Sequence, residues 1–257
     1  MTIPNLPPEA LPLPLEPVAE PPRVPVTARV QAILEMLLCS SVPTQLAIGW
    51  TLRLAGWSPV DGEGALQLGF VTALTLLDTL ALVGLMVFVM RSHGERPSTL
   101  WLGQRPIARE ALTGIVHVPV VFAIGAVLLL SIRTLTPQLH DVDVNPFEAL
   151  AGDSLKNAAM LAAVAILAGG VREELQRAFL LDRFERYLGP AWAGVAVLSV
   201  AFGLGHLLQG RDAAVATGAM GAFWAVVYLR RRSSVAPMVS HALFNSLEVL
   251  LIAAVKH

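Results

Sequence analysis

Long apolar segments recur at regular intervals along this 257-residue chain, after a beginning rich in proline. Each segment is close to the ~20 residues that a helix needs to cross the hydrocarbon core of a bilayer. The predicted segments run approximately over Val30–Ala55, Leu66–Met90, Ala111–Ile132, Leu155–Leu181, Ala191–Leu208, Ala213–Leu229 and Val235–Val255. The pattern therefore predicts an all-α, polytopic integral membrane protein with about seven transmembrane helices.

Composition favours the same fold class, because 55% of the residues are hydrophobic, only 14% are charged and the mean hydropathy is +0.64. Ordinary soluble domains are less apolar. The net charge of -1 and the scattered basic residues give no indication of nucleic-acid binding, so we expect no nucleic-acid partner. The single cysteine, Cys39, excludes an internal disulfide and a cysteine-rich zinc site.

The N-terminal region differs from the rest, since its first 26 residues hold half of the prolines. It has neither a basic start nor an apolar stretch of the kind found in a secretory signal. We expect residues 1–28 to form a disordered tail and residues 29–154 to form the N-terminal transmembrane helices.

Arginines concentrate in alternate loops, for example at Arg96, Arg183 and Arg231, whereas the other loops carry acids such as Asp61 and Asp141. Basic loops stay on the cytoplasmic side of a membrane. The chain is therefore expected to be a multi-pass protein of the cell membrane with a cytoplasmic N-terminus. High alanine content and the proline-rich start favour a bacterial source.

A charged run interrupts the fourth predicted helix: Arg172-Glu173-Glu174-Leu175-Gln176-Arg177. Ionised groups at bilayer depth cost about 2.5–3.5 kcal/mol each on insertion scales and are usually functional. Glu173 and Arg177 are four residues apart and share a helix face, while Glu174 reaches Arg177 at a spacing of three. A structural salt bridge is the alternative interpretation, although two carboxylates against one facing arginine leave a residual negative charge.

Two further helices carry a histidine one turn from a second notable residue: Phe202 and His206 on the fifth, and His241 and Asn245 on the seventh. Alone, each pair could serve packing through interhelical hydrogen bonds. Together with the carboxylate pair they supply a base, two ligands or acids, and an oxyanion donor, which are the parts of a hydrolytic centre. The polar residues of the first three helices are interpreted as pairing or interfacial groups, and Asp78 is notable because it lies near the middle of its span.

These residues resemble the motifs of the CAAX-protease and bacteriocin-processing intramembrane peptidases, which include the type II CAAX prenyl endopeptidases. The family motifs are Glu-Glu-x-x-x-Arg, Phe-x-x-x-His and His-x-x-x-Asn or Asp on successive membrane helices. The second motif matches Phe202 to His206 and the third matches His241 to Asn245. The resemblance extends over about Leu161–Leu250.

The first motif has one residue fewer between the glutamate pair and the arginine. If Arg177 is the anchor, the family's glutamates fall on Arg172 and Glu173; if the pair is the anchor, they fall on Glu173 and Glu174. Either alignment keeps Glu173 as a motif glutamate. We therefore expect Glu173 to be the base, with Glu174 as the alternative.

The resemblance implies that residues 155–257 form a catalytic transmembrane core that hydrolyses a peptide bond of a membrane-associated peptide or protein. A glutamate would activate water, and His206 and His241 would hold that water directly or through a metal. Zn2+ bound by Glu173, His206 and His241 is one option, which would make the protein a metalloprotease; a metal-free reaction is the other. Asn245 would donate to the oxyanion, and Arg177 would orient the carboxylates. The expected partners are the substrate and the lipid bilayer.

Two other function classes stay open. A catalytically inactive membrane scaffold or bacteriocin-immunity protein of the same fold would account for the irregular first motif. An ion- or proton-coupled transporter would also place glutamate and histidine among apolar helices, although no inverted repeat is visible in the sequence.

The predicted helix bounds put the site residues at different depths. His206 lies roughly fifteen residues into its helix, whereas Glu173 lies about eight residues from the same side, at 1.5 Å per residue. Convergence of the site requires that the fifth helix begin deeper than predicted, or that the fourth be long and strongly tilted.

Overall fold

The computed structural model describes residues 24–152 and 154–256, and within them the chain is all-α, as predicted. The helices are α1 (Val26–Leu38), α2 (Val42–Leu54), α3 (Leu68–Ser92), α4 (Pro97–Trp101), α5 (Ile107–Leu135), α6 (Pro146–Gly152), α7 (Leu155–Ala165), α8 (Glu174–Tyr187), α9 (Ala191–Leu204), α10 (Arg211–Arg231) and α11 (Val235–Lys256). Two 3-10 turns, η1 (Pro137–Leu139) and η3 (Leu207–Gln209), and a π-helical segment, η2 (Ile166–Glu173), lie between them. Of the predicted tail over residues 1–28, residues 1–23 lie outside the described residues, and residues 26–28 belong to α1.

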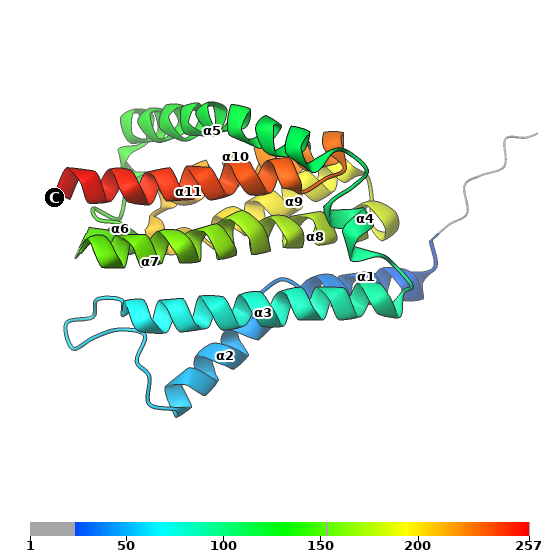
Figure 1. Ribbon diagram of the computed structural model, residues 1–257, viewed down its shortest axis with the longest axis horizontal. Helices are drawn as coiled ribbons and strands as arrows, with labels where there is room; N and C mark the ends of the chain where they lie inside the picture. Colours follow the sequence, from blue (N-terminus) through cyan, green and yellow to red (C-terminus); the bar gives the residue numbers. More distant parts are fainter. Residues whose placement is uncertain (1–23, 153, 257) are drawn as a thin grey trace, which may run out of the picture.

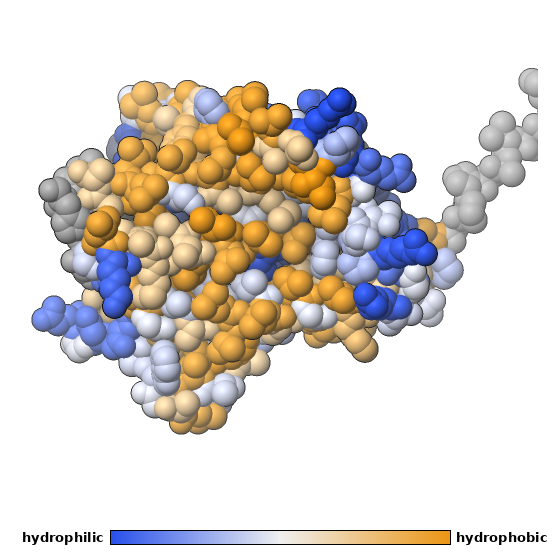
Figure 2. All heavy atoms as spheres, viewed as in Figure 1, coloured by the Kyte–Doolittle hydropathy of each residue, from blue (hydrophilic) through white to orange (hydrophobic). Residues whose placement is uncertain are grey.

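Within the described residues, five segments are long and apolar enough to cross a membrane, which indicates a multi-pass membrane protein. They are Val26–Leu54, Leu68–Ser92, Ile107–Leu135, Arg211–Arg231 and Val235–Ala254. Figure 2 shows the corresponding apolar surface between more hydrophilic ends. The prediction of about seven spans is thus confirmed only in part, because the fourth and fifth predicted segments are helical without meeting this criterion. The fourth carries the charged run, and the 14 residues of α9 extend only about 21 Å.

The first predicted span is divided into α1 and α2 at Cys39–Ser41. Ser41 has a left-handed backbone with a φ of 75°, and Pro43 follows it in the first turn of α2. Proline lacks the N–H that would continue the helical hydrogen bonds and disfavours a helical residue before it. The break directs the hydroxyl of Ser41 toward α3, where it donates to Asp78 at 2.7 Å.

Of the elements that carry the three motifs, η2 packs directly on α11, and α9 packs on α8 and α10. The helix α11 contacts α5, α7, α10 and η2, and α3 packs on the other side of η2 and α7 (Figure 1). In the same view α1 lies beside the C-terminal end of α3 and packs on α8, whereas α2 diverges from the bundle on the far side of α3. The molecule therefore consists of a bundle formed by α5 to α11, with α1, α2 and α3 on one side of it.

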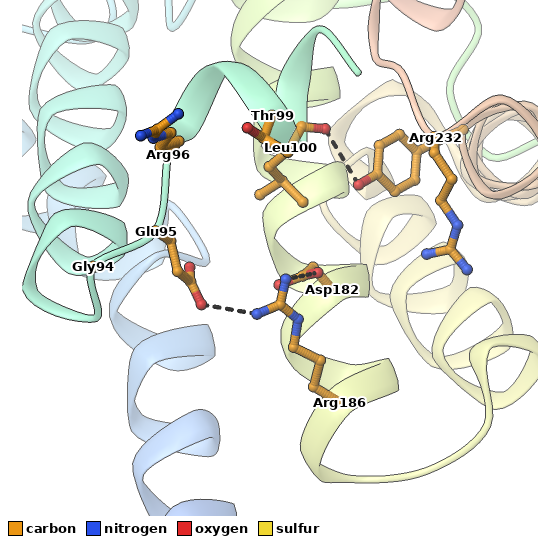
Figure 3. A pocket seen from close by; sticks show the side chains of 9 residues that line it. Gly94, Glu95, Arg96, Thr99, Leu100, Asp182, Arg186 and Arg232 are labelled. Atoms are coloured by element: carbon orange, nitrogen blue, oxygen red, sulfur yellow. Dashed lines mark hydrogen bonds and ion pairs between the residues drawn. The ribbon is translucent and has the colours of Figure 1, made fainter. Parts of the chain in front are cut away.

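The basic loops meet at one end of the bundle, as the alternation of charge predicts. Arg186 bonds to Glu95 at 3.0 Å and to Asp182 at 2.9 Å beside a cavity of about 390 Å³ (Figure 3). Arg232, from the loop after α10, lines the same cavity. Because arginine loops stay cytoplasmic, this end is expected to face the cytoplasm, and the orientation stays a prediction.

Candidate active site

The glutamate pair lies where a continuous helical rod changes its winding. α7, η2 and α8 follow one another without a break from Leu155 to Tyr187, and η2 ends at Glu173. π-helical turns are rare and are found frequently at functional sites. The change from π to α winding between Glu173 and Glu174 separates the surroundings of the two carboxylates.

Two glycines allow η2 to approach α11. A Cβ atom on Gly170 would lie 2.8 Å from the Cα of Ala242, and one on Gly169 would overlap the side-chain nitrogen of Asn245. Any other residue at these positions would push the two elements apart. The glycine pair thus brings the charged run against the helix that carries the third motif.

Glu174 is the buried partner of His241. Its Oε1 lies 2.8 Å from Nδ1 of His241 and is also the oxygen paired with Arg177. Glu174 is 2% exposed and His241 is 4% exposed. Because a carboxylate oxygen accepts, Nδ1 of His241 carries a hydrogen, and its Nε2 is the nitrogen left for other contacts.

Aromatic rings pack against His241 and Arg177. The Trp224 ring stacks on His241 with 3.8 Å between ring centroids and 17° between planes. Arg177 lies 4.6 Å from the centroid of Phe202, a cation–π arrangement. The imidazole and the guanidinium are therefore fixed by packing as well as by hydrogen bonds.

Glu173 lies on the other side of His241 and borders open space. Its Oε2 is 3.9 Å from Nε2 of His241, and its Oε1 accepts from Nη2 of Arg172 at 3.2 Å. The Glu173 side chain is 17% exposed, against 1% for Glu174. Of the two carboxylates, Glu173 is the one that water can reach.

His206 lies just after the end of α9, whereas the predicted helix continued past it to Leu208. Its Nδ1 donates to the carbonyl oxygen of Phe202 at 2.8 Å, and the two rings are 4.7 Å apart. Nε2 is therefore the ring nitrogen of His206 that is left for other contacts. Among the described residues, no hydrogen bond or ion pair joins His206 to Glu173 or His241.

One cavity of about 1360 Å³ has five of the six predicted site residues on its wall: Glu173, Arg177, His206, His241 and Asn245. Glu174 does not line it. Apolar residues such as Phe70 of α3 and Phe122 of α5 form much of the remaining wall. The volume exceeds that of ordinary small-molecule sites.

The predicted Zn2+ ligands do not form a metal-binding group as they lie. Within the described residues there is no cluster of three His, Cys, Asp or Glu side chains placed to hold an ion. Glu173 and His241 face each other, but His206 reaches neither of them. We therefore assign no reaction step to a metal.

Three contributors to this site were absent from the sequence prediction. Trp224 and the pair Gly169–Gly170 hold the catalytic candidates in place without any reactive group of their own. The glycine pair lies one residue before the charged run, and small residues in a membrane helix indicate close approach of another helix. The stacking of Trp224 on His241 has no such signal, because it joins neighbouring helices at positions seventeen residues apart.

Comparison with protein families agrees with this geometry. Residues 154–247 match the family described as type II CAAX prenyl endopeptidase Rce1-like. This segment contains a Rce1-like domain of the type II CAAX prenyl endopeptidase family, and it runs from the start of α7 into α11. The predicted family resemblance is thus confirmed over this segment, and the match indicates a peptidase. Neither curated proteins nor solved structures gave a match to the chain.

Proposed function

We propose that the protein is an intramembrane endopeptidase in which Glu173 activates the attacking water. The observation that carries this proposal is the 3.9 Å gap between Oε2 of Glu173 and Nε2 of His241 on the cavity wall. A water molecule can donate one hydrogen to each of these atoms at ordinary hydrogen-bond lengths. Two acceptors on one water raise the nucleophilicity of its oxygen.

In the proposed reaction, Glu173 takes a proton from water while the oxygen attacks the scissile carbonyl carbon. The carbonyl oxygen becomes an oxyanion, to which the amide nitrogen of Asn245 donates. Glu173 then passes its proton to the leaving nitrogen, and the C–N bond breaks to give a carboxylic acid and an amine. Removing an oxyanion donor in hydrolases typically costs about 2.7–4 kcal/mol.

The other motif residues support this pair. Glu174 holds His241 in the tautomer that presents Nε2 to the water, and Arg177 neutralises Glu174 in the buried site. Nε2 of His206 is left to accept a hydrogen bond from the substrate or the water. The greater exposure of the Glu173 side chain favours Glu173 over Glu174 as the base.

The substrate is proposed to be a membrane-associated peptide or protein segment. Apolar residues of α3 and α5 on the cavity wall, such as Phe70, Leu74 and Phe122, match a chain that enters from the bilayer. The motif residues that line the same cavity come from η2, from the end of α9 and from α11. A peptide bond bound beside Glu173 would thus have apolar side chains near its flanking residues.

Hydrolysis of a quenched fluorogenic peptide with an apolar anchor, by the protein in liposomes, tests the proposal. We expect Glu173→Gln to lower kcat by about a hundredfold to ten-thousandfold and His241→Ala to act similarly. Glu63→Gln, in the exposed loop before α3, is the control and should leave kcat unchanged.

Equal rates for wild type and Glu173→Gln would contradict the peptidase proposal. A fully inactive wild type would favour the scaffold or immunity alternative. Proton or solute flux into the same liposomes that Glu173→Gln abolishes would favour the transporter.

A further inference from the structure

A buried polar cluster lies where the N-terminal helices meet η2. Asp78 of α3 is 1% exposed. Its Oδ2 accepts from Oγ of Ser41 at 2.7 Å, and its Oδ1 accepts from Oγ1 of Thr44. Nη1 of Arg172 donates to Asp78 at 3.2 Å and to Ser41 at 2.7 Å. The Asp78 carboxylate is therefore held by the α1–α2 break and in turn holds Arg172.

Arg172 connects this cluster to the proposed base. While Nη1 faces Asp78 and Ser41, Nη2 donates to Oε1 of Glu173 at 3.2 Å. A guanidinium is planar, so fixing one terminal nitrogen also fixes the direction of the other. Its Nε is buried without a partner in the part of the chain that the structure describes. Asp78 and Ser41 are therefore the groups that set the orientation of Arg172 relative to Glu173.

The sharing of Arg172 between two carboxylates also bears on the free oxygen of Glu173. An arginine that had only Glu173 to pair with would tend to bind both of its oxygens side by side. Because Asp78 and Ser41 occupy Nη1, Arg172 engages Oε1 of Glu173 and leaves Oε2 directed at His241. The cluster thus restrains the base without occupying the atom that would take the proton.

We propose that Asp78, held by Ser41 and Thr44, is a positioning residue that sets the Glu173 carboxylate through Arg172. The inference rests on the proposed role of Glu173. It assigns a function to helices outside the family match, since Asp78, Ser41 and Thr44 all precede residue 154. The same contacts could alternatively serve only to join α3 to η2, and that alternative predicts a loss of stability without a specific effect on Glu173.

The test compares Arg172→Gln, Asp78→Asn and the double variant in the full chain. Arg231→Gln is the matched control, because it breaks an arginine pair with a carboxylate buried as deeply as Asp78, the 1% exposed Glu110, away from the site. Three quantities are measured: thermal unfolding, kcat and KM for the fluorogenic peptide, and the carboxylate stretching band of Glu173. The band is the infrared difference between each protein and the same protein carrying Glu173→Gln.

Each single variant is expected to lower kcat by about tenfold to a hundredfold, as for a misplaced catalytic group, with KM nearly unchanged. Each should also displace the Glu173 band, because the carboxylate loses or changes its hydrogen bond from Arg172. Arg231→Gln should lower the unfolding temperature and leave kcat and the band as in wild type. If Asp78→Asn does not fold, the double variant, which removes both charges, should fold and keep the low kcat.

A Glu173 band that stays in place in Arg172→Gln and in the double variant overturns the inference, whether or not the protein is active. An active protein whose kcat is unchanged in these variants overturns it as well. A displaced band in a protein without any peptidase activity supports the positioning of Glu173 and contradicts the proposed function. Failure of the positioning inference and failure of the proposed peptidase function therefore give different results.

Discussion

At the scale of single residues, burial distinguishes the two neighbouring glutamates. Glu174 is enclosed between Arg177 and His241, whereas Glu173 borders the cavity. A base must exchange protons with a water beside the substrate, which an enclosed carboxylate cannot do. The motif order alone could not decide between them, because the choice depends on which side of His241 each carboxylate occupies.

Gly169 offers a test of this geometry that removes no reactive group. In Gly169→Ala the added methyl group would overlap the Asn245 amide and displace it from the cavity wall. We expect kcat to fall by about a hundredfold. Gly84→Ala in α3, where a Cβ meets nothing within 4 Å, should leave kcat unchanged. Equal activity of the two variants would show that Asn245 does not need its present position.

At the scale of elements, the sequence predicts most helices but misplaces the ends of some of them. The apolar periodicity locates α3, α5, α10 and α11 closely, because each is bounded by charged or turn residues. α8 instead continues to Tyr187, six residues past the predicted end at Leu181. Charged residues of this last stretch are paired with distant partners, as Arg183 is with Glu95, and such pairs are not visible in a local pattern. With the longer α8, Glu173 and His206 lie at similar distances from the same end.

The ends of α8 and α10 are joined by an exposed ion pair between Glu185 and Arg232, with 2.6 Å between Oε2 and Nη1. The hydrogen bond from Arg232 holds the pKa of Glu185 below its ordinary value of 4.5. A carboxylate with a depressed pKa stabilises the fold above pH 4.5, and this contribution is lost as the pH falls through the lower, folded-state pKa.

Glu185→Gln should therefore lower the unfolding temperature slightly at pH 7, since exposed pairs contribute about 0–1 kcal/mol. The difference from wild type should shrink as the pH is lowered below 4.5. Tryptophan fluorescence during heating at a series of pH values measures it. A difference that persists unchanged at the lowest pH would show that the ion pair is not its origin.

At the scale of the whole molecule, the N-terminal helices and the family domain depend on each other. The domain supplies the charged run and the histidines, while α1–α3 supply a wall of the cavity and the carboxylate that faces Arg172. The sequence locates the motifs because their residues lie one turn apart. It could not locate the Asp78–Arg172 pair, which joins positions far apart along the chain and follows no local spacing.

Arg183 joins these two parts at the basic end of the bundle. It is 1% exposed and bonds to Glu35 of α1 and to Glu95, after α3, at 2.8 Å each. Replacing it by methionine leaves both carboxylates without this partner, and breaking a buried ion pair from one side costs about 3–5 kcal/mol. We expect Arg183→Met to unfold at a clearly lower temperature than wild type, whereas Arg230→Gln, at an exposed position, should not.

The triple variant Arg183→Met, Glu35→Gln, Glu95→Gln separates the loss of attraction from the burial of unpaired charge. Neutral replacement of a whole buried ion group is often tolerated, because the desolvation cost of the charges disappears with them. We therefore expect the triple variant to regain much of the unfolding temperature that Arg183→Met loses. If it unfolds as early as the single variant, attraction through Arg183 is itself what holds α1 and α3 to the domain. Peptidase activity measured below both unfolding temperatures should be retained, since Arg183 does not line the cavity that contains Glu173.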